Sequence, residues 1–289
     1  MICGTNLQFT YSNKEKLQIM SRLNYTMVHP VPPGNSYRLN GNETAIYEYF
    51  DEAERLGLGV MYDMRHSTYL YSCSQSGQRR HQADLTGFAN LTLVQPQIEE
   101  FRSRKGLLVW YTGDEPDGPP TPLNTTKDTK DLIHSVDPYH PVALVLNCAD
   151  YHWTEFSSGA DILLADPYPI ALNGAFSKRW STPITYDYGV SGCDGCMGSF
   201  YDITNRIDDW KNRARLSGKA RDMPLWIVPQ MFADHGDEFW WRAPEGDEGA
   251  VQVVLAWNHG VTGHCAWYFS SAGVDVLYVR SSFSYRRQS

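Results

Sequence analysis

The stretch Trp110 to Gly118, WYTGDEPDG, places three carboxylates directly after an apolar run that begins at Leu107. Carboxylates are costly to bury, so acids at the end of an apolar strand lie either in a solvated turn or in a site that uses them. Carboxyl groups held in unlike surroundings can divide the work of acid and base. This cluster is therefore the first candidate for chemistry.

The three acids are predicted to differ in role. Side chains alternate along a strand, so Tyr111 and Glu115 share one side while Trp110 and Asp114 share the other. We expect Glu115 to point into a site and Asp114 to orient a neighbour through a hydrogen bond. Asp117 stands in Glu-Pro-Asp-Gly-Pro-Pro, a pattern typical of a turn. Trp110 is expected in the core.

Short apolar runs alternate with helical patterns along the whole chain. Strands are predicted over 2–9, 25–28, 58–62, 107–112, 142–146, 162–165, 225–228 and 262–269. Helices are predicted over 13–23, 43–56, 96–104, 127–136, 203–216 and 249–259. This rhythm is typical of an α/β protein, a single-domain (β/α)8 TIM barrel over residues 1–289.

Two alternatives to this fold are less favoured. Residues 184–187 also have a strand pattern and would then replace 2–9; we prefer the first count, because the region near 186–200 is a Gly- and Cys-rich loop insertion. An open doubly wound sheet is less favoured, because no glycine-rich phosphate loop follows an early strand.

In a TIM barrel, chemistry gathers where the carboxyl ends of the strands meet. Polar and aromatic residues follow most of the predicted strands, as though aimed at one rim. The candidate catalytic residues are Glu115, Asp166 and Asp114. The candidate substrate-binding residues are Asp63, Arg65, Tyr168, Asp187, Tyr188, Gln230, Trp267 and Tyr268. The aromatic run 239–241 is expected either as a wall of the site or packed on the barrel mouth.

Composition excludes several classes of function. The net charge of −8 disfavours nucleic acid and anionic membranes as partners. No apolar run is long enough to span a bilayer. The chain has one Cys-x-x-Cys pair and no His-Glu-x-x-His motif, so we predict no metal and no other cofactor. No Gly-x-Ser-x-Gly elbow indicates a serine esterase.

Four Asn-x-Ser/Thr sequons indicate a secreted glycoprotein; they begin at Asn24, Asn42, Asn90 and Asn124. In that setting Cys193 and Cys196 would form a local disulfide. We therefore expect an extracellular monomer, although residues 1–16 do not resemble a signal peptide.

Several strand ends together resemble those of TIM-barrel glycoside hydrolases. Gly113-Asp-Glu-Pro116 is similar to their fourth strand end, and Asp166-Pro-Tyr-Pro169 to another. The stretches around 226–232, 256–263 and 266–269 resemble their last two units. The resemblance covers residues 15–270 and implies an acid/base role for Glu115.

The sequence departs from that family at the end of the seventh strand. Retaining members of the large clan carry a nucleophilic Glu there, and this chain has Gln230. A second carboxylate is then expected elsewhere, with Asp166 preferred over Asp63 and Asp187. Carboxylates across the barrel mouth favour inversion, which uses a gap of about 6.5 to 9.5 Å, with Glu115 as acid and Asp166 as base.

The resemblance thus implies hydrolysis of a glycosidic bond in an oligo- or polysaccharide by carboxylate acid/base chemistry, with a carbohydrate as partner. The alternative from another class is a non-catalytic carbohydrate-binding barrel. Such a barrel would use the same aromatic rim, and the absence of a Glu at the end of the seventh strand is consistent with it. A metal hydrolase built from His29, Asp63 and Asp166 is a third, less favoured reading.

Overall fold

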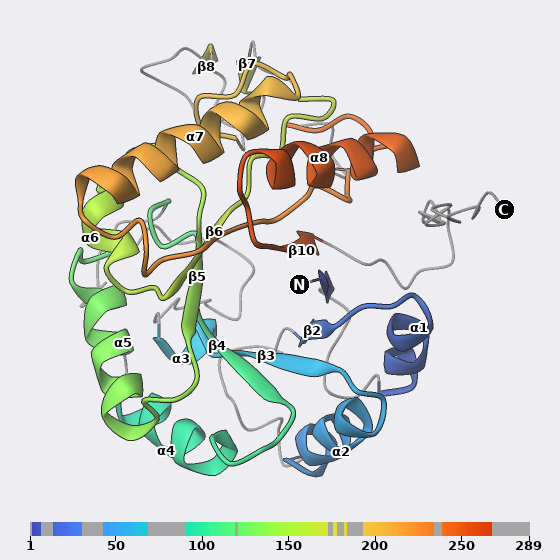
Figure 1. The fold of residues 1–289 in the computed structure, drawn as a ribbon, viewed down its shortest axis with the longest axis vertical. Coiled ribbons are helices and arrows are strands. Elements are labelled where there is room, and N and C mark those ends of the chain that lie inside the picture. The colour runs from blue at the N-terminus through green and yellow to red at the C-terminus, as the bar shows by residue number, and fades with distance from the viewer. Residues whose placement is uncertain are drawn as a thin grey trace, which may run out of the picture.

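A computed structural model of the protein describes residues 2–6, 14–30, 43–68, 91–118, 121–172, 176–177, 182–183, 193–233 and 239–267. Its centre is a curled sheet of parallel strands with helices outside it (Figure 1). The strands pair in the order β1-β10-β9-β6-β5-β4-β3-β2, and β1 also pairs with β2, so the pairings form a closed ring. The predicted α/β class is confirmed.

The strands of this sheet overlap the predicted ones at every unit. They are β1 Ile2–Asn6, β2 Met27–Pro30, β3 Gly59–Asp63, β4 Leu107–Asp114, β5 Val142–Leu146, β6 Ile162–Ala165, β9 Leu225–Ile227 and β10 Gly263–Trp267. The presence of β1 in the sheet favours the first strand count. Residues 184–187, the alternative strand, lie outside the described residues.

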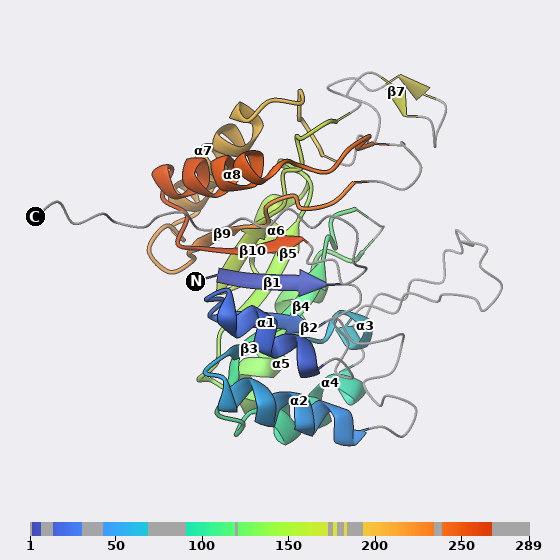
Figure 2. The ribbon, with the colours of Figure 1, turned by 90° about the vertical axis from the view of Figure 1, so that its right-hand side faces the viewer.

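A separate antiparallel pair, β7 Phe176–Ser177 with β8 Thr182–Pro183, was not predicted. Figure 2 shows it beyond the end of the sheet to which the β1 arrow points.

Helices follow the strands in order. They are η1 Lys14–Lys16, α1 Leu17–Arg22, α2 Glu43–Arg55, α3 Arg65–Thr68, α4 Leu91–Phe101, α5 Thr125–Val136, α6 Trp153–Ser157, α7 Tyr201–Leu216 and α8 Gly246–Asn258. Residues after Trp267, where a helix following β10 would begin, lie outside the described part of the chain.

Local sequence explains where two of these helices begin and end. Gly57 follows α2 with φ of 71°, a conformation that glycine adopts without strain and that commonly ends a helix. At α8, Glu245 and Glu248 form a capping box that satisfies the first backbone N–H groups. Helix α4 begins at Leu91, five residues before the predicted start, so that Pro96 lies within the helix.

Apolar side chains fill both faces of the curled sheet. Inside it, Met61, Val109 and Leu164 pack in one cluster. Outside it, one cluster that includes Phe50 packs with α2, α4 and α5, and another that includes Trp210 packs with α6, α7 and α8. A sheet buried on both faces explains why its strands are apolar runs rather than alternating ones.

Two further sequence predictions concern the disulfide in the loop insertion and the lack of a membrane-spanning segment. Cys193 and Cys196 form a disulfide, as expected from their spacing. The part of the insertion over 184–192 lies outside the described residues. Among the helices that are described, none has the length and apolarity to cross a bilayer.

Candidate functional site

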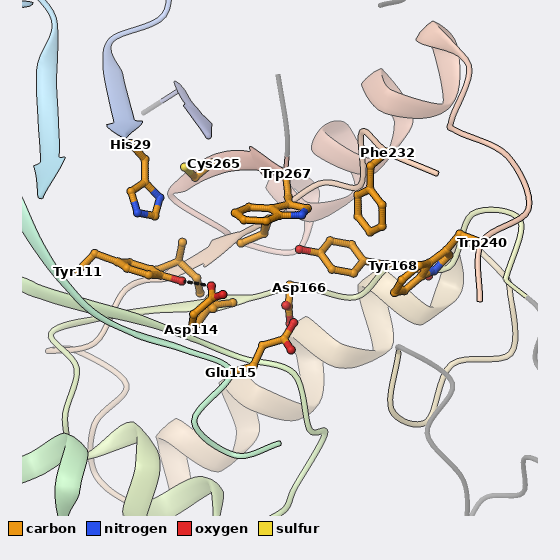
Figure 3. Close-up of a pocket in the computed structure, with 13 residues that line it drawn as sticks. His29, Tyr111, Asp114, Glu115, Asp166, Tyr168, Phe232, Trp240, Cys265 and Trp267 are labelled. Atoms are coloured by element: carbon orange, nitrogen blue, oxygen red, sulfur yellow. Dashed lines mark hydrogen bonds between the residues drawn. The ribbon is translucent and has the colours of Figure 1, made fainter. Parts of the chain in front are cut away.

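A cavity of about 220 Å³ lies at the carboxyl ends of the strands. Figure 3 shows acids at its floor, polar groups at one side and aromatic rings at the other. The residues that line it are His29, Tyr111, Asp114, Glu115, Val145, Leu164, Asp166, Tyr168, Val228, Phe232, Trp240, Cys265 and Trp267. Clustered acids and rings at this end of the sheet make it the candidate active site.

The end of β4 turns two neighbouring acids into the same cavity. The pairing of β4 with β5 shifts register between Tyr111 and Gly113, which interrupts the alternation of side chains. Glu115 then adopts φ of 51°, rare for a residue with a side chain. Asp114 and Glu115 therefore both line the cavity, which corrects the expectation that they face opposite sides. Such backbone strain is concentrated at functional sites.

Figure 3 shows the carboxyl groups of Glu115 and Asp166 turned toward each other, and they are close enough for a hydrogen bond when one of them is protonated. Burial raises the pKa of Glu115; the bond to Asp166 opposes that rise, and the charges of Asp114 and Asp117 add to it. Burial, followed by the charge and hydrogen bond of Glu115, raises the pKa of Asp166 well above its ordinary value. Two carboxylates in contact repel each other, so the pair favours a state in which one of them is protonated.

This contact corrects the expected spacing of the pair. Inverting enzymes hold their two carboxyl groups about 6.5 to 9.5 Å apart and retaining enzymes about 5 to 5.5 Å apart. A direct hydrogen bond between Glu115 and Asp166 is shorter than either arrangement. Asp166 Oδ1 is buried without a partner in the described part of the protein, so this oxygen can still accept a hydrogen bond or hold the proton.

Asp117 is more than a turn former. Its side chain is buried and accepts the backbone N–H of Asn147 at 3.3 Å and of Cys148 at 2.7 Å. It therefore fixes the loop after β5. The Asn147 side chain in turn donates to Glu115 Oε1 at 3.3 Å, so Asp117 supports the candidate acid through that loop.

At the polar side of the cavity, carboxylate groups are paired with a cation and with hydrogen-bond donors. Asp63 Oδ2 contacts His29 Nε2 at 2.9 Å and accepts from Arg65 Nε at 2.7 Å, while Asp63 Oδ1 accepts the Arg65 backbone N–H at 2.9 Å. Arg65 also donates to Asp114, which accepts the Tyr111 hydroxyl at 2.8 Å. Although burial opposes it, the charge of Arg65 helps to lower the pKa of Asp63.

Aromatic rings form the opposite side. Tyr168, Phe232 and Trp240 meet edge to face, with centroids 4.9 to 5.7 Å apart. Trp240 Nε1 donates to the Tyr168 carbonyl at 2.7 Å, which fixes the wall to the loop after β6. The run 239–241 thus forms part of the cavity wall through Trp240, while Trp241 is 61% exposed.

Gln230 has a structural role rather than the expected contact with substrate. It is fully buried and does not line the cavity. Its amide accepts the Ile170 N–H at 2.9 Å and donates to the carbonyls of Ile170 and Phe232 at 3.1 and 3.3 Å. It therefore joins the loops after β6 and β9.

The predicted site residues thus separate into groups. The cavity brings together Asp114, Glu115, Asp166, Tyr168 and Trp267. Asp63 and Arg65 are buried behind its polar side and contact its lining residues. The remaining predicted residues, Asp187, Tyr188 and Tyr268, lie outside the described residues.

Sequence reasoning did not select two lining residues, His29 and Phe232, as substrate-binding residues. The available signal for His29 was its position at the end of β2, and the sequence suggests it only as a metal ligand in the least favoured reading. Phe232 and Trp240 face the cavity from the chain after β9; the aromatic run 239–241 indicated Trp240 as part of a wall, whereas only a nearby strand end indicated Phe232. Among the residues with described positions, no three His, Cys, Asp or Glu side chains gather as metal ligands would.

Comparison with known proteins gives a fold and no family. No family model matches the chain, and no curated protein matches it. Solved glycoside hydrolases do match its structure. A Bacteroides thetaiotaomicron protein assigned provisionally as an alpha-L-fucosidase has a TM-score of 0.59 at 12% identity, with 96% of this chain and 91% of that chain covered.

Two further neighbours extend the comparison. The endo-beta-1,4-mannanase of Thermotoga petrophila has a TM-score of 0.58 at 13% identity, with 95% of this chain and 69% of that chain covered. The beta-galactosidase of Marinomonas ef1 has a TM-score of 0.60 at 12% identity, with 95% of this chain covered. The chain spans about half, 55%, of that galactosidase. These TM-scores show a fold shared with glycoside hydrolases, and the low identities show no more than the fold.

Proposed function

We propose that this protein is a glycoside hydrolase, with Glu115 as the general acid. The observation that carries the proposal is the contact between the buried carboxyl groups of Glu115 and Asp166 in a cavity walled by aromatic rings. A carboxyl that keeps its proton near neutral pH suits an acid that protonates a leaving oxygen. The glycosidase neighbours support carbohydrate as the substrate class.

The contact between the two acids changes the role proposed for Asp166. Its carboxyl touches Glu115, so we propose that Asp166 positions the acid and exchanges a proton with it instead of activating water across a gap. Asp114 is then the preferred second catalytic carboxylate. It lines the cavity, and hydrogen bonds from Arg65 and Tyr111 hold its carboxyl group in place.

In this account Glu115 gives its proton to the glycosidic oxygen as the bond from that oxygen to the anomeric carbon breaks. Water adds to the anomeric carbon and loses its proton to Asp114. The positive charge that develops on the sugar ring lies near the carboxylate of Asp114 and between the aromatic side chains that line the cavity. Tyr168 and Trp267 are the proposed sugar platforms at the cavity.

The test compares leaving groups. The purified protein is assayed on nitrophenyl and alkyl glycosides of several hexoses and deoxyhexoses, with Glu115→Gln and the surface control Glu155→Gln. Loss of general acid catalysis is expected to lower kcat/KM on alkyl glycosides by about 10² to 10⁴-fold. Dinitrophenyl glycosides, whose leaving group needs no proton, should lose much less.

Three outcomes separate the roles. Asp114→Asn should lose activity on both kinds of leaving group, whereas Asp166→Asn should retain activity and shift its pH profile. Equal loss by Glu115→Gln on every leaving group would contradict the acid role. Glu155 is about half exposed and far from any role in this account, so its variant should match the wild type.

A carbohydrate-binding barrel is the second candidate. It is favoured by Gln230, whose amide is committed to backbone groups where retaining relatives are expected to carry a nucleophile. Binding of glycosides without turnover of any of them, dinitrophenyl glycosides included, would support this second function.

We also propose a complete single-domain (β/α)8 barrel, secreted as a monomer. The closed ring of strand pairings supports the barrel. The Cys193–Cys196 disulfide supports an oxidising compartment. The exposed side chains of Asn24 and Asn124 are accessible to glycosylation. Mass spectrometry of the protein from a secretory host, with and without glycosidase treatment, tests the last point.

A further inference from the structure

The polar side of the cavity contains a histidine whose protonation pattern is set by its neighbours. Asp63 is fully buried, and its two oxygens contact His29 Nε2, Arg65 Nε and the Arg65 backbone N–H. An aspartate beside a guanidinium is a charged acceptor with no proton to give. The contact between Asp63 and His29 therefore requires that Nε2 carries the hydrogen.

The other ring nitrogen of His29 is then an acceptor. A neutral imidazole that carries its hydrogen on Nε2 has a lone pair on Nδ1. Nδ1 has no bonding partner among the described residues, and His29 lines the cavity while its side chain is 3% exposed. The Tyr111 ring lies against the imidazole at 4.4 Å between centroids and limits its rotation.

We propose that His29 is a specificity-determining residue whose Nδ1 accepts a hydrogen bond from one hydroxyl of the bound sugar. The proposal rests on the proposed function for its ligand class and adds the group that selects within that class. Asp63 and Arg65 act through His29 as positioning residues, because they fix the hydrogen on Nε2. The chemistry favours a sugar that presents an unmodified hydroxyl at the polar side of the cavity.

The size of the cavity limits what can present that hydroxyl. Sites for drug-sized ligands run from roughly 300 to 1,000 Å³. The cavity here is about 220 Å³, which suits a single sugar ring. The selected hydroxyl therefore belongs to the ring that fills the cavity, between the imidazole and the aromatic side formed by Tyr168, Phe232 and Trp240.

The first test reads the tautomer without a sugar. Nitrogen-15 NMR of histidine-labelled protein, with the His29 signals assigned from His29→Phe, reports which ring nitrogen carries the hydrogen. We expect the Nε2–H form in the wild type. An Nδ1–H form, or an imidazolium at neutral pH, would overturn the proposal whatever the protein does to sugars.

The second test pairs a ligand change with a protein change. Calorimetry measures binding of methyl hexosides and of their monodeoxy and monofluoro derivatives to Glu115→Gln protein, in which hydrolysis is blocked. One ring position should show about 10-fold weaker binding when its hydroxyl is removed, the size of a lost hydrogen bond. Fluorine at that position should be equally poor, because it cannot donate.

Adding His29→Phe should make the parent and that one derivative bind equally. His29→Gln, which keeps an acceptor oxygen, should restore part of the difference and guards against a variant that fails to fold. If the hexosides bind and the difference survives in His29→Phe, this inference is wrong while the proposed function stands. If no hexoside binds, the proposed function fails and the inference falls with it.

Discussion

Two groups of buried acids, one behind the polar side of the cavity and one lining it, lie in opposite electrostatic surroundings. Asp63 is buried beside Arg65 and His29, so its charge has a cation and two further hydrogen-bonding partners. Glu115 and Asp166 are buried against each other, and the cation that favours the charge of Asp166 is Arg206. Burial is common to both groups, while the pKa of Asp63 is lowered and the pKa values of the pair are raised.

The opposite pKa shifts of these two groups indicate which acids are suited to proton transfer. An acid whose charge is fully compensated is fixed in one protonation state and can only hold its neighbours. Acids that lack compensation must share or exchange a proton, which is what a proton donor needs. The candidate site therefore combines a polar side fixed by Asp63 with a pair of acids, Glu115 and Asp166, that can gain or lose a proton.

The largest effect is expected from breaking the compensated group. Asp63→Asn leaves the Arg65 guanidinium without its buried carboxylate partner and should lower the free energy of unfolding by about 3 to 5 kcal/mol. Urea unfolding at pH 7 measures it. The matched control is Asp51→Asn, whose partner is Arg104 at 2.7 Å but whose side chain is 66% exposed. That surface pair should cost about 1 kcal/mol or less.

The same group predicts a pH dependence. The folded-state pKa of Asp63 is lowered, so its contribution is present above the unfolded value and lost as pH falls through the folded one. Asp63→Asn should therefore cost less in acid than at neutral pH. A cost that stays constant between the two conditions would show that Asp63 is not held as a charge.

A carboxylate introduced with one N–H donor and no cation among its hydrogen-bonding partners should approach the condition of an acid whose charge is not compensated. Gln230→Glu replaces an amide N–H group with an oxygen that faces the carbonyls of Ile170 and Phe232. It should destabilise the fold by about 2 to 3 kcal/mol and create no retaining glycosidase activity. Gln230→Met is the neutral control for packing. A stable Gln230→Glu protein with new activity would contradict the structural role of Gln230.

The smallest effect has the opposite sign. Asp166→Asn removes an uncompensated buried acid and should raise the free energy of unfolding at pH 7 by on the order of 1 kcal/mol. Since the folded-state pKa of Asp166 is raised, the wild type holds more protons folded than unfolded and loses stability as pH rises from the unfolded value through the folded one. The variant should lose less over that range, by urea unfolding at several pH values. Asp150→Asn, at a site 66% exposed, should change little.

The order of elements was predictable because each strand is a continuous apolar run between helical patterns. Strands β5 and β6 begin and end where the sequence placed them, since both are apolar from end to end. Helices α3 and α6 were missed because four or five residues are too few to show a helical period. Pro96 misled the start of α4, because proline prefers the first turn of a helix.

The site was predictable in membership and less so in geometry. Glu115 and Asp166 were selected because acids that follow apolar strands are conspicuous. The side chain of Asp114 points into the cavity because of a register shift in β4, and no local residue pattern predicts such a shift. Asp117 is buried because its carboxylate accepts hydrogen bonds from backbone N–H groups of a loop that begins 30 residues later in the sequence. Such contacts depend on the assembled fold and not on neighbouring sequence.

The central claim is that Glu115 and Asp166 share one proton at neutral pH. Carbon-13 NMR of the labelled side-chain carboxyl groups, assigned with Glu115→Gln and Asp166→Asn, follows both through a pH titration. We predict that the two signals move together, that one proton remains on the pair well above pH 5, and that Asp166→Asn changes the titration of Glu115. Two independent titrations near the ordinary carboxyl pKa values, each unaffected by changing the other residue, would contradict the account.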